Sequence, residues 1–365
     1  MLRYLFRRLL YTIPTLWVMV TLIFLLSRVL PGTFGQEQIS QAGEGFYSKG
    51  SQQQRNAAHE QLLARTNQHL PLFYVTFAPL ATSQATSNYS YLLPDLTWNG
   101  TKNQYHIWAA ALFTGSLGES FASSRPVLEI LWEAAGNTIW LLLISMALTI
   151  VLALLISVSI VQDRAVKRRR VLLSFLILLD SFPVFLTGLL LLLLLANPDA
   201  LQLFPVFGLG YHHAGEQSGF MSFIVNLPHL VLPIICLVLA ELPYLTNHLY
   251  TSLKGTLQAD YIRTARAKGL PQNQVIVKHA LRNALLPVIT VLSDMLPALV
   301  AGTVVIETIF AIPGVGRLLV TSVLARDFPV IVGIVVIIAI AKMLSHIVAD
   351  ILYALADPRI RHNQK

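Results

Sequence analysis

The sequence contains six runs of mostly apolar residues, each about as long as a helix that crosses a membrane. A helix needs about 20 residues to span the hydrocarbon core of a bilayer. Apolar residues make up 55% of the chain and charged residues only 12%, so a water-soluble core could not hide this much apolar surface. The sequence therefore predicts an all-α integral membrane protein with six transmembrane helices. The predicted spans are Leu9–Leu30, Thr138–Val161, Val171–Ala196, Leu227–Tyr250, Val288–Thr308 and Val330–Leu355.

The first run has basic residues before it and could be mistaken for a secretory signal peptide. Arg3, Arg7 and Arg8 precede its apolar core. A signal usually has an apolar core of about 7–15 residues and a small-x-small cleavage site after it. This run is longer, and no such site follows it. We therefore expect residues 1–30 to be retained as the first span.

The distribution of basic residues predicts the orientation of the spans. With a cytoplasmic N-terminus, the cytoplasmic segments hold more than half of the 26 Lys and Arg residues, as the positive-inside rule requires. They include residues 164–170 and the segment between the fourth and fifth spans. Both termini are then cytoplasmic. The net charge of +8 follows from this topology, so no nucleic-acid partner is expected.

The segment Asp260–Pro287, between the fourth and fifth spans, has the pattern of two short helices. The first is expected to end near Lys268, because Gly269 can adopt the left-handed conformation that closes a helix and Pro271 suits a first helical turn. An ordinary cytoplasmic loop lying on anionic lipid would show the same basic and apolar pattern. In the second helix an apolar stripe at helical spacing is formed by Val277, Leu281, Ala284, Leu285 and Val288.

The identities of the residues in this segment indicate its function more specifically than its apolar and basic pattern does. ARAKG followed by KHALRNALLP closely resembles the conserved cytoplasmic loop of ABC-importer permeases, in the branch that carries oligopeptides, dipeptides and nickel. Arg263 and Thr264 replace the Glu and Ala of the general motif, as in one of the paired permeases of that branch. The resemblance implies that loop 251–287 couples the chain to separate ATPase subunits. The coupling residues that it implies are Asp260, Tyr261, Arg263, Thr264, Ala265, Arg266, Ala267, Lys268, Gly269, Arg282, Asn283 and Pro287.

Motifs similar to those of this family extend along most of the chain. In LDSFPVFLTGLLL, Pro183 is expected to kink the third span and Gly188 to permit a close helix approach. After the fifth span, IETIFAIPGVGRLLVTSVLARDFPVI resembles a family segment that contains Glu307 and Asp327, and a short outside helix is expected there. The terminal ADILYALADPRIR also matches the family.

This topology places a long stretch, residues 31–135, outside the cytoplasm, and the part least similar to the family, Gln36–Gln104, lies within it. Within it, residues 76–104 look like an insertion relative to most members of the family, with aromatic residues such as Tyr89, Tyr91 and Trp98. The insertion could contact a substrate-binding protein, or it could be a surface loop peculiar to this lineage.

The resemblance implies the type I ABC importer permease fold. The expected parts are an N-terminal transmembrane helix over 1–30 and an extracytoplasmic region over 31–135. A transmembrane domain of five helices is expected over 136–355, followed by a cytoplasmic tail over 356–365.

The implied function is that of a permease subunit in the inner membrane, forming half of the path for peptides or a related solute. The implied partners are a second homologous permease, two ATPase subunits, an extracytoplasmic substrate-binding protein and membrane lipid. The sequence has no GxxxxGK[ST] loop and no nucleophile–base arrangement. We therefore expect the chain to be no enzyme and to bind no cofactor, with ATP and Mg held by the partner ATPases.

Two other functions remain open from the residues alone. A secondary transporter or channel would work without an ATPase, and Lys342 and His346, four residues apart in the sixth span, could form its proton relay. Against it stands the lack of a second, internally repeated half. A membrane scaffold or receptor is the third possibility. The adjacent His212 and His213 are weak candidates for metal ligands, because no further ligand has suitable spacing, and no residue of the substrate path is identified.

Overall fold

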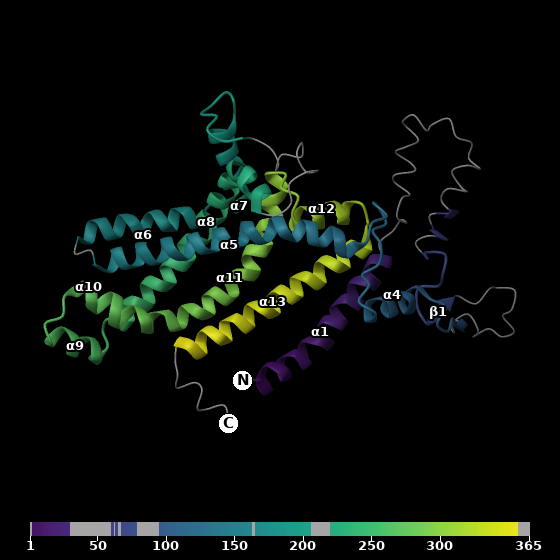
Figure 1. The fold of residues 1–365 in the computed structure, drawn as a ribbon, viewed down its shortest axis with the longest axis horizontal. Coiled ribbons are helices and arrows are strands. Elements are labelled where there is room, and N and C mark those ends of the chain that lie inside the picture. Colours follow the sequence, from purple (N-terminus) through teal and green to yellow (C-terminus); the bar gives the residue numbers. More distant parts are fainter. Residues whose placement is uncertain are drawn as a thin grey trace, which may run out of the picture. The chain divides into compact units, whose positions relative to one another are not determined.

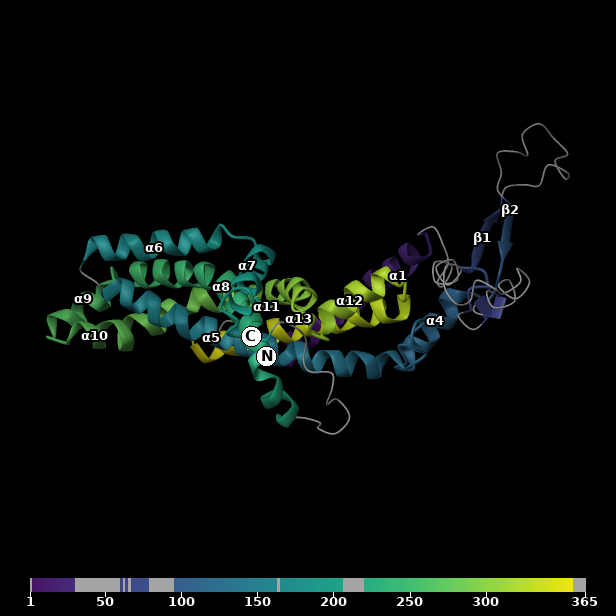
Figure 2. The same ribbon diagram turned by 90° about the horizontal axis from the view of Figure 1, so that it is seen from above.

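The computed structural model describes residues 2–29, 60–61, 63–64, 67–78, 95–162, 165–205 and 220–356 (Figures 1 and 2). They divide into two compact units. The first comprises Met1–Thr12, Glu133–Val320 and Ile337–Lys365, and the second comprises Ile13–Trp132 and Thr321–Val336.

The described chain is helical, apart from one pair of short strands. The strands are β1 (Val75–Ala78) and β2 (Asp95–Trp98). The helices are α1 (Leu2–Val29), α4 (Gln104–Phe113), α5 (Val127–Gln162), α6 (Val166–Asp180), α7 (Val184–Leu191), α8 (Phe220–Thr256), α9 (Asp260–Ala267), α10 (Gln272–Gln274), α11 (Leu281–Ile309), α12 (Val315–Leu324) and α13 (Phe328–Ala356), together with the π-helical stretches η2 (Leu192–Ala196) and η4 (Val275–Ala280).

Four described helices are long and apolar enough to cross a membrane, and there are five if one bent pair counts as a single span. The four are Val127–Gln162, Leu227–Thr256, Gln272–Leu292 and Phe328–Leu352. Three of them agree with the second, fourth and sixth predicted spans. Gln272–Leu292 overlaps only the start of the predicted fifth span, Val288–Thr308, which lies within α11 (Leu281–Ile309). For the first predicted span, α1 is a continuous helix, of which Ile13–Leu26 forms a shorter apolar part.

The bent pair lies where the third span was predicted. α6 and the segment Val184–Ala196 meet at an angle of 96°. The kink expected at Pro183 is therefore present, and it is a full break: Pro183 has an extended backbone with φ −58° and ψ 140°. Proline lacks an amide hydrogen and its ring obstructs the preceding turn, which explains why α6 ends before it.

α8 is the centre of the first unit. Of the most apolar part of this helix 61% is buried, against about 30% for the other candidate spans. It packs against α6, α7 and α11, and its fully buried side chains include Leu237, Leu245, Leu249 and Leu253. The other helices therefore keep large apolar faces for lipid or for other subunits.

The second unit contains the described parts of the stretch 31–132. β1 and β2 pair antiparallel, with Val75 opposite Trp98. This ladder departs from the all-α prediction. β1 overlaps the start of the predicted insertion 76–104, and β2 lies within it. Tyr89 and Tyr91 lie outside the described residues. α4 packs on α1, where Phe24, Tyr105 and Trp108 form an aromatic cluster.

Candidate functional site

The first helix of the predicted coupling segment is α9, and its end is where the sequence predicts it. Lys268 caps the helix, and Gly269 has a left-handed backbone with φ +77°. The amide of Gly269 donates a hydrogen bond to the carbonyl of Arg266 at 2.9 Å. Asp260 in the first turn and Arg266 in the last both suit the helix dipole. The expected role of Gly269 in closing the helix is confirmed.

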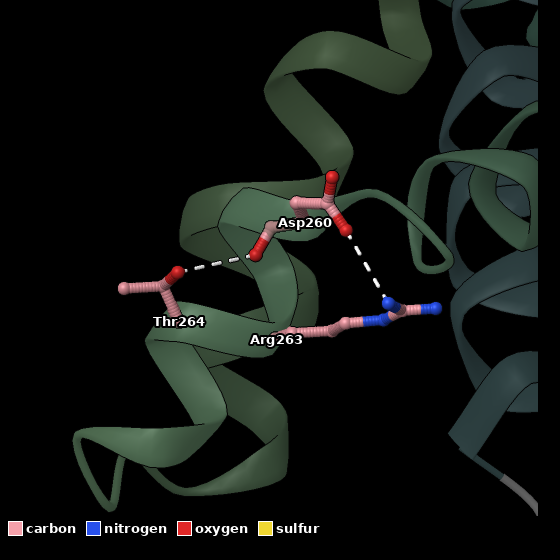
Figure 3. Close-up of polar contacts among 3 residues, drawn as sticks. All are labelled: Asp260, Arg263 and Thr264. Carbon is pink, nitrogen blue, oxygen red and sulfur yellow. Dashed lines mark hydrogen bonds and ion pairs between the residues drawn. The ribbon is translucent and has the colours of Figure 1, made fainter.

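α9 has one buried face and one exposed face. Ile262 is fully buried and Ala265 nearly so, and both belong to the hydrophobic core of the first unit. Arg263 pairs with Asp260 at 3.4 Å, but their side chains are 75% and 96% exposed (Figure 3). Thr264 donates to the carbonyl of Asp260 at 3.2 Å. The outward face is formed by Asp260, Tyr261, Arg263, Thr264, Arg266 and Ala267, with Lys268 and Gly269 following.

Two hydrogen bonds join the start of α11 to the helices that precede it, α9 and α8. The side-chain nitrogen of Asn283 (Nδ2) donates a hydrogen bond to the hydroxyl of Tyr261 at 2.8 Å, and this bond joins α9 to α11. Ser252 of α8 donates to the carbonyl of Ala284 at 2.7 Å. The structure therefore brings Tyr261 and Asn283 together, as two of the predicted site residues. Arg282 and Pro287, also predicted, are exposed on α11.

The second predicted helix differs from its prediction. It does not end before the fifth span but continues from Gln272 through η4 into α11. η4 is π-helical, and its wider turn adds a residue and rotates the buried face. Val275 and Ile276 are consequently buried completely, whereas Val277, expected on the apolar stripe, is 49% exposed.

A second group of contacts lies at the other end of α11, around Glu307, whose side chain is completely buried. One carboxylate oxygen accepts a hydrogen bond from the hydroxyl of Thr138 in α5 at 2.7 Å. The other accepts from the amides of Gly316 and Arg317, at 2.7 and 3.0 Å. The hydroxyl of Thr138 also accepts from the amide of Val315 at 2.8 Å. We call these five residues the Glu307 cluster.

Further bonds hold the turn between α11 and α12 beside this cluster. Asn137 of α5 donates to the carbonyl of Pro313 at 2.9 Å. The guanidinium of Arg317 donates to the carbonyl of Ala311 at 2.6 Å, and Ala311 has φ +55°. On another side, Gly188 of α7 lies against side chains of the last turn of α11. Four helices therefore meet at this end of α11.

The carboxylate of Glu307 was not among the ionisable groups that the sequence singled out. Of the proton-relay candidates in the sixth span, Lys342 is exposed on α13 and His346 is half-buried there. His212 and His213 lie outside the described residues. The sequence signal for Glu307 is a glutamate at the end of an apolar run, followed by the small residues of Pro-Gly-x-Gly.

No metal centre is visible in the described part of the chain. No three His, Cys, Asp or Glu side chains there lie close enough together to hold an ion. Cys236 is a free, buried cysteine in α8, and its thiol donates to the carbonyl of Val184 at 3.4 Å. This thiol therefore contributes to the packing of α8 against α7.

These features define a helical membrane protein of the transporter-permease class, with an exposed amphipathic helix between two spans. Residues 163–362 match the family described as binding-protein-dependent transport system inner membrane component. This match covers more than half of the chain. The chain belongs to this family of transport-system permeases, and the resemblance found in its motifs is confirmed.

Several relatives share most of the chain. The oligopeptide transport system permease protein AppB of Bacillus subtilis (strain 168) is 37% identical over 71% of this chain and 80% of its own. The dipeptide transport system permease protein DppB of Lactococcus lactis subsp. cremoris (strain MG1363) is 34% identical over 71% and 80%. The glutathione transport system permease protein GsiC of Salmonella choleraesuis (strain SC-B67) is 30% identical over 99% and 100%.

A solved structure of an amino acid ABC transporter with histidines is a more distant match. It shares 14% identity and a TM-score of 0.43, covering 62% of this chain and 94% of its own. This score is too low to define a common fold.

Proposed function

We propose that this chain is one permease subunit of an ABC importer and forms half of the membrane path for a peptide or a related solute. The observation that carries the proposal is the exposed face of α9, which presents the family's coupling motif while Ile262 and Ala265 anchor the helix in the core. The names of the relatives favour a peptide substrate: one is an oligopeptide, one a dipeptide and one a glutathione permease.

In this proposal α9 docks on one of two separate ATPase subunits, which hold ATP and Mg and hydrolyse the nucleotide. The docking surface is the outward face of α9 from Asp260 to Gly269, and the contact of Tyr261 with Asn283 passes its displacement to α11. A second, homologous permease completes the path, and an extracytoplasmic binding protein delivers the solute. The chain itself catalyses no reaction.

The proposed topology has six spans of the type I importer fold, with both termini and the coupling segment in the cytoplasm. Its structural support is the hydrogen bond from Gln162 of α5 to Asn273 of α10, at 3.0 Å. The end of α5 and the basic start of α6 therefore lie at the same end of the first unit as α9 (Figures 1 and 2). Two basic segments on one side agree with the positive-inside rule.

The proposed domain boundaries follow this topology. The first span is 1–30, the extracytoplasmic region is 31–135, and the transmembrane domain of five helices is 136–355, with its coupling loop at 251–287. Residues 356–365 form the cytoplasmic tail.

The test is to purify the tagged chain from its own membranes in mild detergent and to identify its partners and bound small molecules by mass spectrometry. We expect a second permease, ATPase subunits and a binding protein loaded with peptide. Recovery of this chain alone, in a form that still moves solute in liposomes, would instead establish a secondary transporter. The family membership favours the importer over that alternative.

A further inference from the structure

We propose that Glu307 is a positioning residue for transport: with Thr138, it closes the extracytoplasmic end of the α5–α11 pair, so that displacement at the coupling segment reaches the outer side of the membrane. This inference rests on the proposed importer function. The coupling motif does not account for Glu307, because α9 lies at the other end of α11 (Figure 1).

The hydrogen bonds of Glu307 fix three segments in one arrangement. The carboxylate receives bonds from Thr138 of α5 and from the first two amides after Val315 of α12. It thereby supplies the acceptors that the start of α12 lacks within its own helix. Apolar contacts would hold these helices together but would let them slide, whereas bonds to named amides fix both register and direction.

The backbone around Glu307 is shaped to leave room for its carboxylate. A Cβ added at Gly314 would lie 2.4 Å from the Glu307 Cδ, and one added at Gly316 would lie 2.5 Å from the Val304 Cα. Neither distance is compatible with a side chain. The two glycines therefore permit α12 to approach the carboxylate closely enough for its amides to bind.

The same two helical segments are also tied at the cytoplasmic end. Gln162, at the end of α5, donates to Asn273, just before η4 and α11. Thr138 and Gln162 are separated by 24 positions in the sequence, which corresponds to about 36 Å of helix. This distance is slightly more than the hydrocarbon thickness of a bilayer. The α5–α11 pair is thus closed on both sides of the membrane.

A pair of antiparallel helices tied at both ends responds to displacement differently from a pair tied at one end. With the Glu307 cluster intact, movement of α9 tilts α5, α11 and the start of α12 as one body. Without it, the turn at residues 310–314 can deform, and the displacement is dissipated before it reaches α12. Loss of the cluster should therefore uncouple ATP hydrolysis from transport.

The experiment uses the full importer, with its ATPases and binding protein, in proteoliposomes, and measures ATP hydrolysed per solute moved. Glu307→Leu and Thr138→Val remove the bonds between the helices. We expect transport to fall about tenfold in Glu307→Leu and less in Thr138→Val, with a smaller fall in ATP hydrolysis, so that the ratio rises. Glu307→Gln and Thr138→Ser keep the geometry and should stay near the wild-type ratio.

Thr149→Val is the matched control on α5. Thr149 is buried like Thr138, but its hydroxyl donates to the carbonyl of Ser145 in the same helix, at 2.7 Å. Its loss removes a buried hydroxyl without releasing another helix, and the ratio should not change. If Glu307→Leu fails to assemble, Thr138→Val decides, because valine retains the shape of threonine.

Two results would overturn the inference. Either the ratio stays at the wild-type value in Thr138→Val, or it rises equally in Thr149→Val. A wild-type complex that does not couple ATP hydrolysis to transport at all would contradict the proposed function instead, and the two failures are therefore distinguishable.

Discussion

The two ends of α11 are held by different kinds of contact. At the coupling end, the hydrogen bond between Tyr261 and Asn283 is exposed to solvent, and the chain enters α11 through the π-helical η4. At the other end, Glu307 is fully buried and bonded to two other segments. One helix therefore joins an exposed surface, the proposed docking site, to a buried and tightly bonded point within the subunit.

The π-helical stretch suits the coupling end. A π turn is less favourable than an α turn and is found mostly at functional sites. Conversion of η4 to an α-helix would rotate α10 and the preceding loop relative to α11. A rigid α-helix would offer no such adjustment, so in the proposed importer η4 would let α9 adjust its position when it docks on an ATPase subunit.

The first and largest expected effect concerns the end of α9. Gly269→Pro cannot adopt φ +77° and loses the amide that bonds to Arg266. Because Gly269 is exposed, the subunit should still insert and assemble, but α9 ends differently and transport should fall to background. Gly269→Asn is the matched control, since asparagine tolerates the left-handed region. Full uptake by Gly269→Pro in vesicles would contradict the coupling role of α9.

The second prediction compares two glycines that are needed for different reasons. A Cβ at Gly269 meets no atom within 4 Å, whereas one at Gly314 would lie 2.4 Å from the Glu307 Cδ. Gly314→Ala should therefore destabilise the subunit by about 3 kcal/mol through overpacking. Gly269→Ala should destabilise the subunit by only about 1 kcal/mol, because the only cost is the left-handed backbone conformation of an alanine.

Thermal unfolding in detergent measures both changes on the same preparation. The expected order is a clearly lower Tm for Gly314→Ala than for Gly269→Ala. Equal decreases in Tm for the two variants would mean that the close approach of Gly314 to the Glu307 carboxylate does not restrict the side chain at position 314.

Much of the coupling end could be predicted from the sequence, because its determinants are local. Gly269 and the spacing of α9 lie within a few residues of each other, and the structure agrees with both. Pro271, expected in the first turn of the next helix, is instead the N-cap residue just before α10. The register of η4 could not be predicted, since the same residues fit either an α or a π turn, and only packing buries Ile276 rather than Val277.

The other end of α11 depends on contacts between distant parts of the chain. Thr138 and Glu307 are 169 positions apart, and no pattern in either segment indicates the other. The break at Pro183 was visible as a proline in an apolar run, but its angle of 96° depends on how α7 packs against α8 and α11. Apolar runs in the sequence were enough to predict where spans lie, whereas the hydrogen bonds between the helices could be identified only from the structure.

The third prediction is an intermediate effect at the contact between α9 and α11. Tyr261→Phe removes the hydroxyl that accepts from Asn283 at 2.8 Å. An exposed hydrogen bond of this kind contributes about 0.5–1 kcal/mol, because water replaces it, so the Tm should change little. If the bond transmits displacement, ATP hydrolysed per solute should rise even though stability hardly changes. Asn283→Ala should show the same behaviour, and the double variant should add nothing further.

The smallest expected effect on stability belongs to the ion pair of Asp260 and Arg263. With side chains 96% and 75% exposed, the pair is screened by water and salt. Asp260→Asn should leave both the Tm and the assembly of the subunit unchanged. The contrast with Glu307 lies in burial, because the Glu307 carboxylate is completely buried and bonded to two other segments, whereas Asp260 is exposed to water. If Asp260→Asn clearly lowers the Tm, the exposed pair stabilises the coupling end more than its exposure implies, and the proposed difference between the two ends of α11 is contradicted.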